Sequence, residues 1–251
     1  MSLRPCWSYV QARLQARHGE RLTEGDWRVL EAVRSPDHFI DRARAMALRR
    51  FSERLNTGMS SHAIERELRK AWRDYVEEVA SWCPPDWRPA ILWCAPLADL
   101  PSFAALLRSE APRWAQQDAA LAAFFELVQG ATTRSPLAVL LPGPKREPTL
   151  AGRWYAHWRS LWPHGARERR ALTALADTVK AHVARLDRTG PQHTSVDYRR
   201  TLAQAASRMF RSHGASPIAV FCHLALVAFD LERLRGGLVR RALFAAGRET
   251  T

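Results

Sequence analysis

The residues with the clearest capacity for chemistry are arginines, because they dominate the charge of the chain. Lys and Arg together number 38 against 25 Asp and Glu, and 35 of the 38 basic residues are arginine. Residues 145–251 alone hold 19 basic and 8 acidic residues, an excess of 11 positive charges. Planar guanidinium groups pair with carboxylates and phosphates through two parallel hydrogen bonds. This half of the chain therefore predicts either an acidic partner or an arginine-rich surface that only contacts solvent.

Two groups of arginines form the predicted binding surface. In the first, at 153–170, the arginines alternate with aromatic residues such as Trp154 and Trp158, a mixture that can stack on single-stranded nucleic acid. The same aromatic residues fall on one helical face, which is typical of a core. The second group lies at 199–211. The predicted partner-binding residues are Arg153, Arg159, Arg167, Arg169, Arg170, Arg199, Arg200, Arg208 and Arg211.

Motifs that would supply catalysis are missing from the sequence. It contains no Gly-x-x-x-x-Gly-Lys-Ser/Thr phosphate loop, no Gly-x-Gly-x-x-Gly and no Gly-x-Ser-x-Gly nucleophile elbow. The nine histidines form no His-x-x-x-His pair for a metal. Cys222 and His223 are adjacent, so they would point in different directions from a helix. We therefore expect a non-enzymatic protein with no catalytic residue, no cofactor and no metal site.

The cysteines and the apolar runs indicate the cellular location of the protein. The four cysteines are scattered without a Cys-x-x-Cys pair, which is typical of reduced, buried thiols in a cytosolic protein. The longest apolar run, at 218–229, has 12 residues and includes His223, whereas a membrane-spanning helix needs about 20. The N-terminal residues contain no apolar signal segment. These features predict a cytoplasmic protein, peripheral at most at the inner face of a membrane.

Hydrophobic periodicity predicts an all-α fold, a bundle of amphipathic helices. The clearest helix spans about 60–83, where apolar residues from Ile64 to Trp82 recur at steps of three and four. Residues 218–229 are apolar on nearly all sides, so the last helix should be enclosed by others. Further helices are expected at 7–18, 26–33, 86–93, 99–108, 118–130, 166–186, 196–213 and 216–246, and one that begins at Pro36.

Proline content and charge predict how the chain is divided. Residues 132–149 hold four prolines, and the charge balance changes there, which is typical of a linker. We expect N-terminal helical units at 1–131 and a basic C-terminal helical unit at 150–251. The pattern Asp99-Leu100-x-x-Phe103 returns as Asp230-Leu231-x-x-Leu234. Unless this match arises by chance, it indicates a helical-repeat architecture with two or three similar units.

Three stretches carry a family resemblance. Tyr9-Val10-Gln11-Ala12-Arg13-Leu14 is similar to an opening Tyr-x-x-Ala-Arg-Val/Leu, and residues 63–69 look like an Ile-Glu-x-x-Leu-Arg segment. Residues 230–235 resemble a closing Glu-Ile-x-Asn-Leu-Arg, with Arg233 in place of the asparagine. In this order along the chain, the stretches resemble the C subunit (eukaryotic subunit d) of vacuolar and archaeal-type rotary ATPases.

This resemblance implies an all-helical, non-catalytic subunit. Members of the family couple the central shaft to the membrane rotor ring of a proton-translocating ATPase, and a divergent relative would serve as an adaptor in another membrane-associated complex. The expected partners are protein subunits of such a complex, with an acidic protein surface or anionic lipid against the arginines. The alternative is an arginine-rich helical protein that binds nucleic acid, with an affinity that falls steeply as salt rises.

Overall fold

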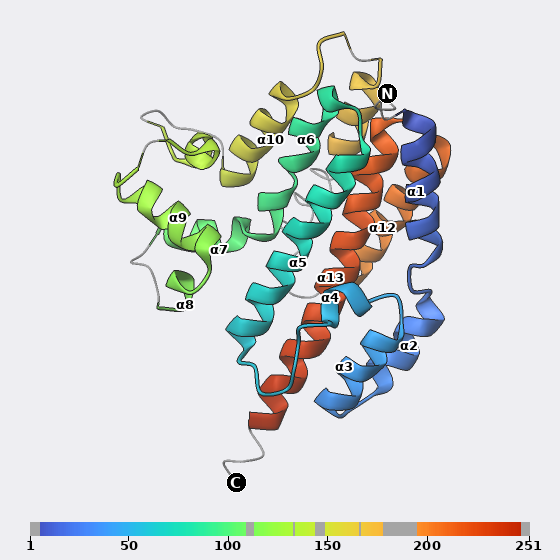
Figure 1. Ribbon diagram of the computed structural model, residues 1–251, viewed down its shortest axis with the longest axis vertical. Coiled ribbons are helices and arrows are strands. Elements are labelled where there is room, and N and C mark those ends of the chain that lie inside the picture. The colour runs from blue at the N-terminus through green and yellow to red at the C-terminus, as the bar shows by residue number, and fades with distance from the viewer. Residues whose placement is uncertain are drawn as a thin grey trace, which may run out of the picture.

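Every regular element in the described part of the chain is a helix (Figure 1). The predicted all-α class is therefore confirmed. The computed structural model describes residues 6–108, 113–132, 134–143, 149–165, 167–177 and 195–246. Its α-helices are α1 (Trp7–Gly19), α2 (Glu24–Ala32), α3 (Pro36–Ala45), α4 (Arg49–Ser52), α5 (Ser61–Trp82), α6 (Arg88–Leu92), α7 (Leu100–Leu106), α8 (Arg113–Gln116), α9 (Ala119–Val128), α10 (Leu150–Ser160), α12 (Ser195–Ser212) and α13 (Pro217–Ala246). Its 3₁₀ helices are η1 (Pro85–Trp87), η2 (Ala95–Ala98) and η3 (Pro136–Leu140).

Helix α5 forms where the apolar pattern places it. The hydroxyl of Ser60 accepts a hydrogen bond from the backbone N–H of Ala63, which satisfies one of the free donors at the helix start. The apolar stripe, which includes Ile64, Leu68 and Trp72, is buried along the helix. The helix ends immediately before Cys83 and two prolines, which cannot continue it.

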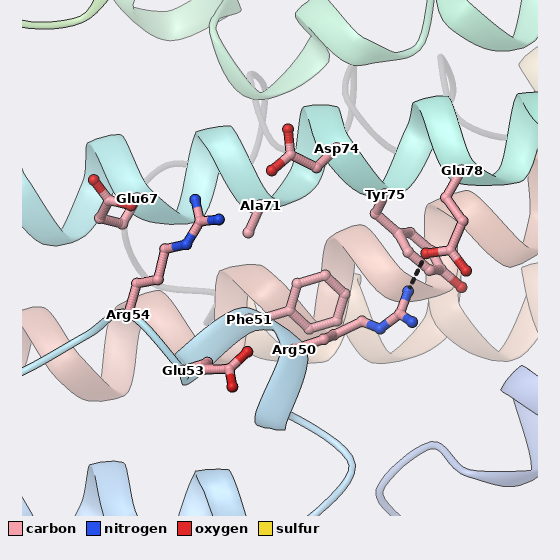
Figure 2. A pocket seen from close by; sticks show the side chains of 9 residues that line it. All are labelled: Arg50, Phe51, Glu53, Arg54, Glu67, Ala71, Asp74, Tyr75 and Glu78. Carbon is pink, nitrogen blue, oxygen red and sulfur yellow. Dashed lines mark hydrogen bonds and ion pairs between the residues drawn. The ribbon is translucent and has the colours of Figure 1, made fainter.

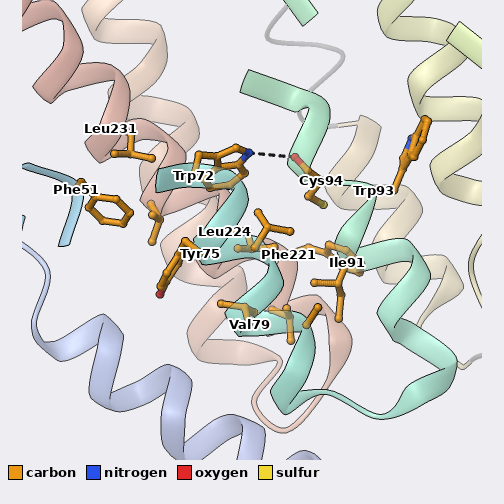
Figure 3. Packing of buried hydrophobic residues seen from close by; sticks show 14 of the residues in the cluster. Phe51, Trp72, Tyr75, Val79, Ile91, Trp93, Cys94, Phe221, Leu224 and Leu231 are labelled. Atoms are coloured by element: carbon orange, nitrogen blue, oxygen red, sulfur yellow. Dashed lines mark hydrogen bonds between the residues drawn. The ribbon is translucent and has the colours of Figure 1, made fainter. Parts of the chain in front are cut away.

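Helices α5 and α13 lie side by side at the centre of the molecule (Figure 1). Between them pack Val79 of α5 and Phe221 and Leu224 of α13, and Ile91 of α6 joins the same cluster (Figure 3). The indole N–H of Trp72 donates to the Cys94 carbonyl at 3.2 Å, so the polar atom of this buried ring is satisfied (Figure 3). Close packing of this kind makes the centre of the protein rigid.

The expectation that the last helix is enclosed is confirmed in its first turns. Ile218, Phe221 and Leu224 are no more than 5% exposed. Ala225 and Ala228, which the apolar pattern also places inside, are only partly buried. The difference follows from helical geometry, because a helix packed on several neighbours still leaves a narrow strip of its surface less covered.

The other helices flank this central pair. Helices α1, α2 and α3 lie on one side of α13, and α7, α8 and α9 lie on the far side of α5 (Figure 1). One hydrophobic cluster includes residues from both sides of the predicted linker, from Val10 to Leu238. Inside the linker range, η3 buries Leu140 in the same cluster. The division into N-terminal and C-terminal units stays a prediction.

Some sequence expectations meet the structure only in part. Of the helix predicted at 166–186, residues 169–177 are helical, and residues 166 and 178–194 lie outside the described chain. Residues 133 and 144–148 of the predicted linker lie outside it as well.

The two copies of the Asp-Leu pattern lie at different positions relative to their helices. Asp99 directly precedes α7, whereas Asp230 lies within α13, far from either end.

Candidate functional site

A groove of about 890 Å³ lies where faces of α2, α12 and α13 meet. We call it the arginine groove, because six of its lining residues are arginines and only three are acids. The arginines are Arg21, Arg28, Arg199, Arg200, Arg233 and Arg240, and the acids are Glu24, Glu31 and Asp230. Leu22, Trp27, Ala203, Gln204, Ser207, Leu226 and Phe229 complete the lining. The cationic side chains therefore outnumber the anionic ones two to one.

Helical spacing brings these residues to one surface. On α2 the lining positions 24, 27, 28 and 31 share a face, and on α12 the positions 199, 200, 203, 204 and 207 do so. Helix α13 contributes positions 226, 229, 230, 233 and 240, which follow one side of the helix for about four turns. Each helix thus presents a single face to the groove.

Both ends of α2 are fixed, which holds its face in place. At the start, the hydroxyl of Thr23 accepts from the backbone N–H of Asp26, and the Asp26 carboxylate accepts from the backbone N–H of Thr23 at 2.9 Å. This reciprocal pair is a capping box. At the end, the guanidinium of Arg241 on α13 donates to the carbonyls of Glu31 and Val33, both at 2.9 Å. These carbonyls are ones that a helix end leaves without an internal partner.

Two arginines of the groove are tightly paired with acids. Arg21 binds Asp230 through two hydrogen bonds, Nε to Oδ2 at 2.7 Å and Nη2 to Oδ1 at 3.0 Å. Burial raises the pKa of the Asp230 carboxyl above its usual value, and the bonds from Arg21 oppose that shift. Arg233 donates to Glu31 at 2.5 Å and to Glu24 at 2.9 Å, and it lies over the ring of Trp27. These ion pairs join α13 to α2 and to the segment before α2.

Three other arginines of the groove are exposed and have no such acid. Arg28, Arg200 and Arg240 come from α2, α12 and α13 respectively. Among the residues with described side chains, no carboxylate lies within ion-pair distance of any of the three. The Nε of Arg28 donates to the carbonyl of Glu24, a neutral group, at 3.3 Å. Their charges therefore stay available to a partner.

The structure divides the arginines that the sequence predicts at 199–211. Arg199 and Arg200 line the arginine groove. Arg208 and Arg211 lie on the same helix, and both are exposed, but neither lines the groove. The guanidinium of Arg211 donates to the hydroxyl of Ser207 at 2.9 Å, one helical turn earlier. Two of the four arginines predicted at 199–211 therefore line the arginine groove.

The arginines predicted at 153–170 do not line the groove. Arg153 donates to the carbonyl of Leu140, and Arg169 donates to the carbonyl of Trp162. Arg159 lies against the rings of Tyr155 and Trp162, and Arg167 and Arg170 are exposed. The aromatic face between them belongs to the core, since Trp158 and Trp162 are at most 5% exposed. Those two rings are not available as a stacking platform.

Sequence reasoning missed Arg21, Arg28, Arg233 and Arg240 as site residues. They lie outside the two arginine groups, and their contribution depends on how distant helices pack. One local signal was present on α2, where the charged positions 24, 28 and 31 recur at helical spacing beside Trp27. That signal marks one face of a helix, but it does not identify the helix that packs opposite.

A second, smaller pocket of about 240 Å³ lies between α4 and α5 (Figure 2). Its lining holds four acids, Glu53, Glu67, Asp74 and Glu78, and two arginines, Arg50 and Arg54. Arg50 donates to Glu78 at 2.8 Å (Figure 2). Arg17 of α1 donates to the same carboxylate at 3.2 Å. Lys70 contacts Asp74 at 3.4 Å. Because three of its four acids, Glu67, Asp74 and Glu78, pair with basic side chains of the protein, this pocket is a weaker candidate than the arginine groove.

Behind that pocket, Tyr75 and His223 form a buried polar pair across the centre of the protein. The Tyr75 hydroxyl and the His223 Nε2 are 2.6 Å apart, and His223 is fully buried. Burial lowers the pKa of His223 to about 3 and raises the pKa of Tyr75 to about 12. Both groups are therefore neutral at physiological pH, and we assign them to the stability of the core.

The described residues offer neither a metal site nor a single membrane-spanning helix. Among them, no three His, Cys, Asp or Glu side chains are placed to hold a metal ion. No single described helix is long and apolar enough to cross a membrane, and only the bent pair Pro85–Ala98 and Leu100–Leu106 passes that test together. Comparison with known proteins finds no match to a family model, to a curated protein or to a solved structure.

Proposed function

We propose that the protein is a non-catalytic adaptor whose arginine groove binds an acidic surface of a protein partner. One observation carries this proposal: Arg28, Arg200 and Arg240 come from three helices to one groove, and no described carboxylate pairs with them. Beside them, Arg21 and Arg233 are matched with acids. The protein thus neutralises one set of groove arginines and leaves a second set for a partner.

The number of arginines matters because each exposed charge contact is weak. One exposed ion pair contributes about 1 kcal/mol or less. A groove that combines several such contacts with partial exclusion of water gives useful affinity, and its positive potential speeds the approach of an acidic partner. Anionic lipid headgroups would be attracted by the same potential, but a flat membrane does not enter a groove, so an acidic protein surface fits better.

The finer form of the proposal comes from the sequence. The resemblance of residues 9–14, 63–69 and 230–235 to the C/d subunit of rotary ATPases favours a coupling subunit at a proton-translocating membrane complex, or a divergent relative in another complex. A rigid bundle of packed helices suits that mechanical role, because close-packed interiors resist compression. Nucleic-acid binding is the second candidate, favoured by the exposed Arg167 and Arg170.

The test is co-purification of the tagged full-length chain from the cells that produce it. Groove substitutions Arg200→Glu and Arg240→Glu are combined in one variant, and Arg208→Glu and Arg211→Glu form a control of equal charge. We expect defined complex subunits to be recovered with the wild type and the control, and to be lost with the groove variant. Equal recovery with all three proteins would contradict the proposal, and recovery that nuclease abolishes would assign the function to nucleic-acid binding.

A further inference from the structure

The dimensions of the arginine groove indicate the shape of its partner. Its lining on α13 runs from Leu226 to Arg240, which corresponds to about 21 Å at the rise of an α-helix. The groove is therefore long, since its lining follows α13 for about four helical turns. An elongated segment fits this site better than a compact small molecule does.

The walls of the groove are themselves suited to a helix. Helix α13 packs against α12, and its ion pairs from Arg233 join it to α2. A helix laid along α13 between α2 and α12 would complete a four-helix arrangement, in which axes are normally 8–10 Å apart. An amphipathic helix that enters a groove of this kind is a recurring mode of protein recognition.

The groove also offers apolar surface to such a helix. Leu22, Ala203 and Phe229 line it and are only partly buried, and they come from the segment before α2, from α12 and from α13. They lie among the arginines, not apart from them. Partly exposed apolar groups gain free energy when a partner removes them from water. A partner that covers both kinds of group must carry apolar residues beside its acids.

The acids of the groove disfavour nucleic acid as its occupant. Glu24 and Glu31 keep side-chain exposures of 57% and 35% although both contact Arg233. A phosphate backbone carries a negative charge on every nucleotide, so it would place phosphates close to these carboxylates. A protein segment can put neutral or basic residues at those points and acids elsewhere. Such repulsion of the wrong partner is a common source of specificity.

From these features we propose that the arginine groove holds an amphipathic, acidic helix of a partner protein. The apolar face of that helix lies on Phe229 and Leu22, and its carboxylates face Arg28, Arg200 and Arg240. This inference rests on the proposed adaptor function and deepens it, because it names the structure and the chemistry of the segment that binds.

The experiment is a fluorescence-polarisation titration of the full-length protein with three labelled probes. The first is an 18-residue peptide with Leu at helical positions i, i+3, i+4 and i+7 and Glu at the flanking positions. The second has the same composition in scrambled order, and the third is an 18-nucleotide oligothymidine. We expect the amphipathic peptide to bind at least about tenfold more tightly than either of the others, since only it matches both the arginines and the apolar residues.

Variants assign the binding to the groove. The combined Arg200→Glu and Arg240→Glu substitutions should weaken the amphipathic peptide at least about tenfold, because two attractive contacts become repulsive. Phe229→Ser should also weaken it about tenfold through loss of apolar contact. The combined Arg208→Glu and Arg211→Glu control carries the same net charge and should stay within about twofold of the wild type, since neither residue lines the groove.

The other outcomes contradict the helical partner, the adaptor function or both. Equal binding of both peptides, with Phe229→Ser unchanged, would show that the groove recognises charge alone, so the inference would fail and the adaptor function would stand. If the groove variant binds every probe as well as the wild type does, both would fail. Tightest binding of the oligothymidine, lost in the groove variant, would replace the protein partner with nucleic acid.

Discussion

Two sets of arginines in this protein have opposite surroundings. Arg69 and Arg73 on α5 bind Asp99 and Asp118, whose side chains are each 2% exposed. The distances are 3.0 Å from Arg69 to Asp118 and 2.9 Å from Arg73 to Asp99. By contrast, the exposed arginines of the groove, such as Arg200, have no described acid partner. Both sets consist of arginines. Those with a buried carboxylate within reach stabilise the fold, and those without one are available to bind a partner.

The two sets of arginines differ in how much stability the fold loses when a charge is removed. Burial raises the pKa of the Asp99 carboxyl, and the neighbouring Arg73 and Arg69 oppose that shift by stabilising the charged form. A buried charge that loses its partner is costly, because nothing then replaces the water it gave up. An exposed arginine is still hydrated, so losing it costs the fold little. The two sets should therefore respond very differently to substitution.

The largest effect is expected from Asp118→Asn. This change removes the negative charge that binds Arg69 in a buried site. The amide oxygen of Asn still accepts from the N–H of Ala120 at the start of α9, so the effect reports the ion pair and not the helix cap. We expect the free energy of unfolding in urea to fall by about 3–5 kcal/mol. The control Asp74→Asn, in an exposed pair with Lys70, should cost less than about 1 kcal/mol. Similar losses in both variants would remove the distinction between buried and exposed pairs.

The next effect concerns pH and the buried Tyr75–His223 pair. His223 has a folded pKa of about 3 against 6.5 when unfolded, so below pH 6.5 the unfolded chain binds a proton that the folded chain does not. The fall in stability should approach about 1.4 kcal/mol per pH unit, which gives a loss of about 1.6 kcal/mol between pH 6.5 and pH 5. His18, whose pKa burial also lowers, adds to the slope in the same direction.

Urea unfolding at several pH values measures this slope. The variant His223→Gln keeps a hydrogen-bonding group near Tyr75 but does not titrate, so its stability should depend less on pH than that of the wild type. His18 contributes equally to both proteins and cancels in the comparison. Parallel slopes for the two proteins would show that His223 is protonated in the folded core, contrary to the burial that the structure describes.

A smaller effect is expected at the start of α2, which carries Arg28 to the groove. Thr23→Ala removes the hydroxyl that accepts from the Asp26 N–H and should reduce stability by about 1 kcal/mol. Thr23→Ser retains the cap and should lose much less. Thermal unfolding of both variants measures the difference, and equal losses would mean that the cap does not hold α2 in place.

The parts of the fold that the sequence predicts are those determined locally. The apolar steps and the Ser60 cap predict α5 to within a residue or two, because both signals lie inside the helix itself. The pairs Arg69–Asp118 and Arg21–Asp230 join residues 49 and 209 positions apart, so they depend on how helices pack. The same is true of the groove, where Arg199 and Arg200 were predicted as binding residues and Arg28 was not.

The central claim is tested most directly in the combined Arg200→Glu and Arg240→Glu variant. Both its free energy of unfolding and its affinity for the amphipathic acidic peptide are measured and compared with those of the wild type. If these arginines serve a partner and not the fold, the free energy of unfolding should stay within about 0.5 kcal/mol of the wild type. Affinity for the amphipathic acidic peptide should fall at least about tenfold in the same preparation. A loss of stability close to that of Asp118→Asn, or an unchanged affinity for the peptide, would contradict the account.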